Sequence, residues 1–154
     1  MTMISGKAFW FKATGAPRPN KFNPKVPQWS FDLSVDTENQ EKLLEKGMKA
    51  SYLRNKDDER GVFLTFTRDS IKTDGSPGKP FRIVDGKNNP WPEGKEVGNG
   101  SDVNVVVSLN EREFRGQKFL KPSAIAVQIW NHVEYEAGFP TKEDDPETEE
   151  VQAW

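Results

Sequence analysis

The stretch Trp29-Ser30-Phe31-Asp32-Leu33-Ser34-Val35 decides the fold, because apolar and polar side chains alternate along its whole length. Successive side chains of a β-strand point to opposite faces of the sheet. The alternation therefore predicts a strand with one face in the core and the other face toward solvent.

Similar patterns predict further strands on both sides of this one. Residues 7–12 place Phe9 and Phe11 on one face and Ala8, Trp10 and Lys12 on the other, so we expect this strand to pair with 29–35. Other strands are expected at 49–55, 61–68, 81–84, 103–109 and 125–129. The segment 14–27 contains four prolines and several cations, which predicts an extended cationic loop. Residues 110–121 predict a hairpin with aromatic and basic side chains near its tip.

One short helix is expected within this set of strands. Thr37-Glu38-Asn39-Gln40 matches a capping box, and the helix should end near Gly47. Its apolar stripe is narrow, consisting of Leu43, Leu44 and Met48, so the helix is an accessory element. Many short strands and one small helix predict an all-β fold, an antiparallel barrel or sandwich.

The chain divides into a body at 1–138, expected to be one domain, and an acidic tail at 139–154, expected to be disordered. The last 12 residues hold six carboxylates and no basic side chain, so residues 1–142 hold 22 basic and 18 acidic side chains. This division favours a body that binds a polyanion and a tail that competes for the same surface. A solvated tail that only aids solubility is the alternative, although the terminal Trp154 favours a binding motif.

The composition disfavours several kinds of chemistry. The chain has no cysteine and one histidine, His132, which is more often structural than catalytic. Asp57-Asp58-Glu59 lies in a charged turn and is a weak candidate for Mg²⁺. No Gly-rich loop opens a long helix, and no apolar run reaches the roughly 20 residues that span a bilayer. We therefore expect no catalytic residue, no metal, no cofactor and no membrane contact, in an intracellular type of protein.

Aromatic side chains lie beside cations at several predicted strand positions. Trp10 is near Lys12, and Phe63 occupies a position on the polar face of its strand. Such rings can stack on the bases of single-stranded nucleic acid while cations neutralise the phosphates. The competing interpretation is that the rings are core residues and that the cations form solvated ion pairs.

The chain resembles the bacteriophage single-stranded-DNA-binding replication proteins, which combine one OB-fold with an acidic tail ending in an aromatic residue. The resemblance rests on Phe22-Asn-Pro-Lys-Val-Pro before the strand 29–35, on Gly98-Asn-Gly-Ser-Asp-Val-Asn-Val-Val-Val-Ser-Leu109, and on the tail that closes on Trp154. It implies an OB-fold-like antiparallel barrel and DNA contacts at Lys25 and at Phe114 with Arg112 and Arg115. It also implies a tail that contacts the phage DNA polymerase and helicase/primase and competes with DNA, in the cytoplasm of the infected bacterial host. A homodimer is a further partnership that it allows.

The combined prediction is a non-catalytic, sequence-tolerant single-stranded-DNA-binding protein of phage replication or recombination. The expected DNA-binding residues are Trp10, Lys12, Lys21, Lys25, Phe63, Arg68, Arg82, Phe114, Arg115 and Lys118. The expected partner-binding residues of the tail are Glu143, Asp144, Asp145, Glu147, Glu149, Glu150 and Trp154. Three alternatives stay open: a protein-interaction module without DNA affinity, an RNA-binding protein and a metal-dependent nuclease.

Overall fold

A computed structural model describes residues 1–134, and the expected acidic tail at 139–154 lies outside the described residues. The elements in chain order are β1 (Thr2–Lys12), β2 (Gln28–Ser34), α1 (Thr37–Glu45), the 3₁₀ turn η1 (Ala50–Tyr52), β3 (Arg54–Asn55), β4 (Val62–Asp69), β5 (Arg82–Asp85), β6 (Ser101–Phe114) and β7 (Gln117–Asn131). No helix among them has the length and apolar character needed to cross a membrane.

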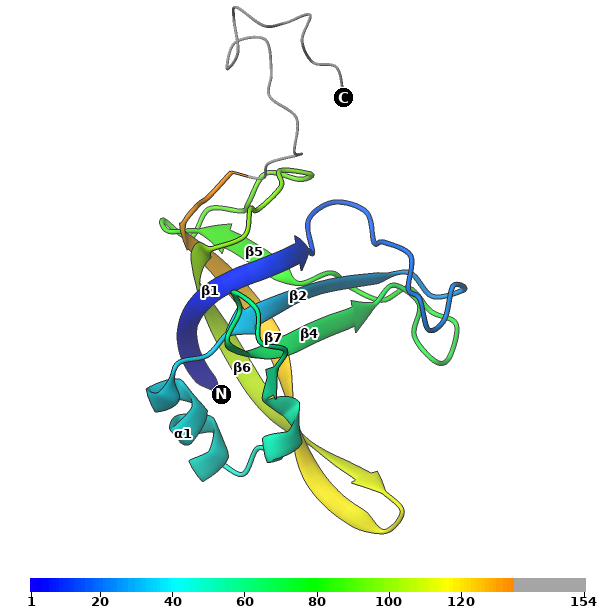
Figure 1. The fold of residues 1–154 in the computed structure, drawn as a ribbon. Helices are drawn as coiled ribbons and strands as arrows, with labels where there is room; N and C mark the ends of the chain where they lie inside the picture. Colours follow the sequence, from blue (N-terminus) through cyan, green and yellow to red (C-terminus); the bar gives the residue numbers. More distant parts are fainter. Residues whose placement is uncertain (135–154) are drawn as a thin grey trace, which may run out of the picture.

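The strands form one curled seven-stranded sheet in the order β3-β4-β2-β1-β6-β7-β5 (Figure 1). All pairs are antiparallel except β5 and β7, which run parallel, so the expectation of a purely antiparallel sheet is corrected at this one pair. The sheet is not closed by a continuous ladder. The Arg68 guanidinium on β4 instead donates to the Ala124 carbonyl on β7 at 2.9 Å. The architecture confirms the all-β, OB-like prediction.

β1 makes the curl because it is shared by two halves of the sheet. Its residues from Thr2 to Ala8 pair with β6, and those from Ala8 to Lys12 pair with β2. The sequence predicted the pairing with β2. The strands cross closely at Gly6, where an added Cβ would lie 2.0 Å from the carbonyl oxygen of Ser34. Only glycine permits this approach.

The core lies inside the curl and contains the apolar face that the sequence predicts. Trp29, Phe31, Leu33 and Val35 are all buried. Phe31 lies at its centre, with ring centroids 5.0 to 5.3 Å from those of Phe11, Phe66 and Phe81. Aromatic pairs at these separations stabilise a core beyond the burial of their area.

Two predictions of secondary structure are wrong. Residues 49–55 form η1 and the two-residue β3 rather than one strand, because Tyr52 packs on Phe119 at the base of the β6–β7 hairpin. The helix is capped by Asp36, whose carboxylate accepts the amide of Asn39 at 2.9 Å, and not by Thr37. The Gln40 side chain donates to the Val35 carbonyl at 2.8 Å.

The last predicted strand contains an irregularity at Ile125. This residue alternates with Val127 and Ile129 in the sequence, but its side chain is 37% exposed whereas theirs are buried. The register shifts between Val106 and Val107, whose partners are Ala126 and Ala124, so Ile125 is the extra residue of a bulge. A shift of one residue reverses the face on which a side chain lies.

Candidate nucleic-acid interface

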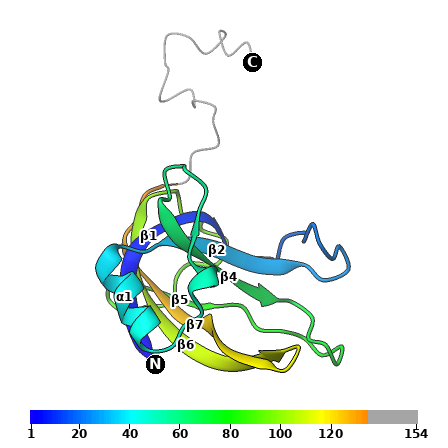
Figure 2. The same cartoon turned by 60° about the horizontal axis from the view of Figure 1, so that its bottom comes forward.

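Three segments project from the same side of the sheet and are called here the three arms (Figure 2). They are the loop 13–27 between β1 and β2, the loop 70–80 between β4 and β5, and the hairpin 110–121 formed by β6 and β7. The first two arms share a base, because the amide of Ser70 donates to the Pro27 carbonyl at 2.9 Å. Gln28 also donates to Asp69 at 2.8 Å.

The arms are strongly cationic. They carry three carboxylates against nine basic side chains, namely Arg18, Lys21, Lys25, Lys72, Lys79, Arg112, Arg115, Lys118 and Lys121. Within residues 1–134, ion pairs reach only two of the nine: Arg18 with Glu96 at 3.0 Å and Lys118 with Glu111 at 3.9 Å. The unpaired cations are exposed, so their charge is available to an anionic partner.

Two of the arms present an aromatic ring near the tip. Phe22 is 98% exposed in the first arm, and Phe114 is 63% exposed in the hairpin. The Asn20 side chain accepts the amide of Phe22 at 3.0 Å and fixes the local turn. In the hairpin, Arg115 and Gly116 both have positive φ, and the Arg115 guanidinium lies 5.1 Å from the Phe114 ring centroid. The site prediction omitted Phe22, although a bulky apolar residue within a proline-rich loop was a signal for it.

Trp10 lies at an irregularity of β1 on the face next to the first arm. Its φ of 49° falls in the left-handed region, and the register between β1 and β2 shifts between Phe9 and Lys12. The backbone amide of Trp10 donates to Asn99 Oδ1 at 2.8 Å and holds this conformation. A bulky residue rarely adopts such a φ, and strained positions of this kind cluster at functional sites. The Trp10 ring is 41% exposed.

Arg60 covers the aromatic ring that the sequence placed on the polar face of β4. Its guanidinium lies 4.0 Å from the Phe63 ring centroid and 4.9 Å from that of Trp10. Phe63 is only 1% exposed, so its ring is not open to a stacking base. Phe63 lies on the outer face of the sheet as predicted, but the Arg60 guanidinium covers its ring.

Two carboxylates hold Arg60 in place. Arg60 pairs with Asp32 at 2.7 Å and with Asp58. The hydrogen bonds from the Arg60 side chain and backbone lower the pKa of Asp58 to about 2, and the Asp58 partner raises the pKa of Arg60. Asp58 and Arg60 are therefore both charged at neutral pH, and Arg60 covers the Trp10 ring from one side.

The remaining predicted residues fall into separate groups. Lys21, Lys25, Phe114, Arg115 and Lys118 lie on the arms, and Trp10, Lys12 and Phe63 lie on the adjoining outer face of β1, β2 and β4.

Arg68 and Arg82 are not on the arms. Arg68 bridges β4 to β7 and lies 5.2 Å from the Phe81 ring centroid. Arg82 lines a cavity of about 200 Å³ with Met3 and Asn104 on the outer face of β5, β7, β6 and β1. The expected partner-binding residues 143–154 lie outside the described residues.

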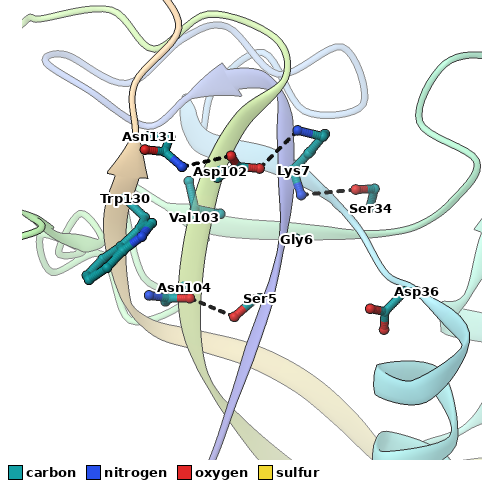
Figure 3. A pocket seen from close by; sticks show the side chains of 10 residues that line it. All are labelled: Ser5, Gly6, Lys7, Ser34, Asp36, Asp102, Val103, Asn104, Trp130 and Asn131. Carbon is teal, nitrogen blue, oxygen red and sulfur yellow. Dashed lines mark hydrogen bonds and ion pairs between the residues drawn. The ribbon is translucent and has the colours of Figure 1, made fainter.

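A cavity of about 590 Å³ lies on the outer face of β1, β6 and β7 (Figure 3). Its polar groups bond to one another: Asp102 accepts from Lys7 at 3.0 Å and from Asn131 at 3.1 Å, and these bonds lower the pKa of Asp102. Asn104 accepts from Ser5 at 2.6 Å. Trp130 forms one wall and is 58% exposed.

His132 contacts the segment between β5 and β6. His132 Nε2 lies 2.9 Å from the Glu96 carbonyl, and its ring meets Trp91 edge to face at 5.1 Å, as expected for a structural histidine. Residues 1–134 contain no group of three histidine or acidic side chains placed to hold a metal ion.

Comparisons with known proteins agree with the architecture. No protein-family model matches the chain, and no curated protein matches it in sequence. Among solved structures, the single-stranded DNA-binding protein gp2.5 of bacteriophage T7 is similar, with a TM-score of 0.58 and 13% identity over 96% of this chain and 94% of that chain. The single-stranded DNA-binding protein of bacteriophage Enc34 in complex with ssDNA has a TM-score of 0.60 and 10% identity over 86% of this chain and 87% of that chain. A C-terminal truncation of the Enc34 protein gives a TM-score of 0.59 and 10% identity, with 87% of each chain covered. The chain thus has the OB-like fold of the phage single-stranded-DNA-binding proteins.

Proposed function

We propose that this protein binds single-stranded DNA, without catalysis and largely without reading sequence, during phage replication or recombination. The arms would neutralise phosphates, and exposed rings on and beside them would stack on bases. Such binding needs neither a metal nor a bound cofactor. It protects and organises the exposed strand.

The observation that carries this proposal is that three cationic arms extend to the same side of an OB-like sheet in the view of Figure 2. Together the arms carry nine basic side chains and two exposed phenylalanines against three carboxylates. A cationic groove with aromatic platforms is how OB-folds bind single strands. The similar T7 and Enc34 proteins are described as single-stranded DNA binding, and one Enc34 structure contains ssDNA.

The acidic segment 143–154 supplies a second part of the proposal. It carries six carboxylates and ends in Trp154, whereas the arms are cationic. The segment competes with DNA for the arms and offers its aromatic end to the phage DNA polymerase and helicase/primase. Truncation after Lys142 should therefore tighten DNA binding and abolish recruitment of these proteins.

The direct test is a titration of the full-length protein and of the truncation after Lys142 with oligo-dT at two salt concentrations, followed by Trp fluorescence. Quenching that weakens with salt and strengthens on truncation is the expected result. Absence of quenching and of any gel shift in both proteins would refute DNA binding. Equal affinity of both proteins for oligo-dT across the salt series would refute only the proposed competition by the tail and would leave DNA binding supported.

One observation favours a second candidate function, a protein-interaction module. Trp130 and Met3 are 58% and 56% exposed on the outer face of the β1–β6–β7 sheet, at the part of β7 remote from the hairpin tip. Exposed aromatic and methionine side chains are enriched where proteins meet. This second function would be identified if the purified protein bound other proteins but bound neither single-stranded DNA nor RNA at moderate salt.

A further inference from the structure

The third arm, the hairpin 110–121, extends beyond the strands that flank it. β1 pairs with β6 only as far as Val107, and β5 pairs with β7 only from Ala126 onward. The hairpin is therefore a two-stranded ribbon, and such a ribbon is marginally stable by itself in water. Its residues 111–118 are exposed on both faces. A contact with another part of the protein is needed to hold its direction.

The segment 47–52 between α1 and β3, called here the support segment, supplies that contact. The amide of Lys49 donates to the Leu120 carbonyl at 3.2 Å. The Phe119 ring centroid lies 6.4 Å from the ring centroid of Tyr52 and 4.7 Å from Lys49 Nζ. The support segment thus holds the base of the hairpin by one backbone bond and by two side chains around one ring.

The support segment is itself anchored in the core. Met48 forms a parallel bridge with Leu120 and is only 4% exposed, and Leu43 on the preceding helix is buried. Gly47 has a φ of 99°, and an added Cβ there would lie 2.9 Å from the Leu120 side chain. A side chain at position 47 would therefore push the support segment away from the hairpin.

The direction of the hairpin decides where its tip lies. At about 3.4 Å per residue, Arg115 at the tip is about 17 Å beyond Leu120. The twist between neighbouring strands varies by about 25° among sheets. A change of this size at the base of the hairpin would move the tip by about 7 Å, which exceeds the roughly 3 Å reach of a hydrogen bond to a phosphate. The tip can therefore meet a bound strand only when the base is held.

We propose that Tyr52 and Lys49 are positioning residues for DNA binding, which act through Phe119 to direct the tip of the third arm toward the strand. In this role neither residue has to touch DNA. The inference rests on the proposed function, because the direction of the hairpin matters only if its tip contacts DNA. It gives a role to a segment that lies outside the three arms.

The test is a double-mutant cycle of Tyr52→Ala with Phe114→Ala, followed as the affinity of the full-length protein for oligo-dT by fluorescence anisotropy. In the wild-type background, Phe114→Ala should weaken binding about fivefold or more, the low end for a stacking contact. In the Tyr52→Ala background, the same change should weaken it less than about twofold, because the tip no longer meets the strand. An equal effect of Phe114→Ala in both backgrounds would mean that Tyr52 acts independently of the hairpin, and it would overturn the proposal.

A second variant changes the direction of the hairpin without removing any group that could touch DNA. Gly47→Ala adds a Cβ close to Leu120, so it should also reduce the effect of Phe114→Ala. The matched control is Gly94→Ala, because Gly94 also has a positive φ, of 78°, but an added Cβ there meets no atom within 4 Å. This control should leave the effect of Phe114→Ala unchanged. An equal loss of coupling in Gly47→Ala and Gly94→Ala would indicate general destabilisation and overturn the proposal.

Two further comparisons separate positioning from direct contact and from loss of the fold. Tyr52→Phe keeps the ring against Phe119 and should retain the wild-type affinity and coupling. Lys25→Gln on the first arm should weaken binding by the same factor with and without Tyr52→Ala, since its charge does not depend on the hairpin. Coupling of Tyr52→Ala to Lys25→Gln as strong as its coupling to Phe114→Ala would overturn the positioning role. Absence of oligo-dT binding by the wild type would refute the proposed function itself.

Discussion

The first arm provides the sharpest test of the proposed DNA contact through Lys21 and Lys25. Both side chains are exposed and make no ion pair within residues 1–134, so replacing them should not disturb the fold. The double variant Lys21→Gln/Lys25→Gln removes two positive charges from the arm. If both side chains contact phosphates, DNA binding weakens most at low salt.

The size of the effect follows from the release of counterions. For single strands, the slope of log K against log[salt] changes by about 0.7 for each phosphate contact. Loss of two contacts should therefore make the slope shallower by about 1.4. Between about 0.05 and 0.2 M salt, the ratio of wild-type to variant affinity should shrink by about sevenfold.

The assay is fluorescence anisotropy with a labelled oligo-dT of about 16 nucleotides, the upper end of an OB-fold site. The control is Lys46→Gln/Lys87→Gln, which makes the same charge change at exposed positions away from the arms. The slope of this control should stay within error of wild type. A slope of Lys21→Gln/Lys25→Gln equal to that of the control would refute the assignment of these lysines to phosphates.

Three further predictions follow from single features of the structure. Phe22→Ala and Phe114→Ala should each weaken oligo-dT binding by about 1–3 kcal/mol without changing the salt slope or the urea midpoint, since both rings are exposed. The folded-state pKa of Asp58 is about 2, below its ordinary 3.8. The stability that its carboxylate contributes is therefore present above pH 4 and lost as pH falls toward 2. The urea midpoints of wild type and Asp58→Asn should converge over this range. Gly6→Ala should lower the free energy of unfolding by about 1–3 kcal/mol or more, measured by urea denaturation, because its Cβ would meet a backbone carbonyl at 2.0 Å.

The strands were predictable where alternation and core burial agree. The segment 29–35 has a strict period of two, and the structure buries its apolar face as expected. The strand predicted at 49–55 was wrong because the alternating pattern there is short and tertiary contacts decide the local structure. Tyr52 lies against Phe119, which is far away in sequence. The exposure of Ile125 was not predictable because the bulge is set by the pairing of β7 with β6, and local periodicity carries no information about that pairing.

The candidate site was predictable in its residue types but only partly in its arrangement. Proline and lysine content identified the first arm, and the turn signal identified the hairpin. The cover over Phe63 depends on Arg60, whose guanidinium reaches the ring only because the turn after β3 folds back onto β4. Arg68 shares a face with Leu64 and Phe66, so alternation already directs it toward the core side and away from an outer groove.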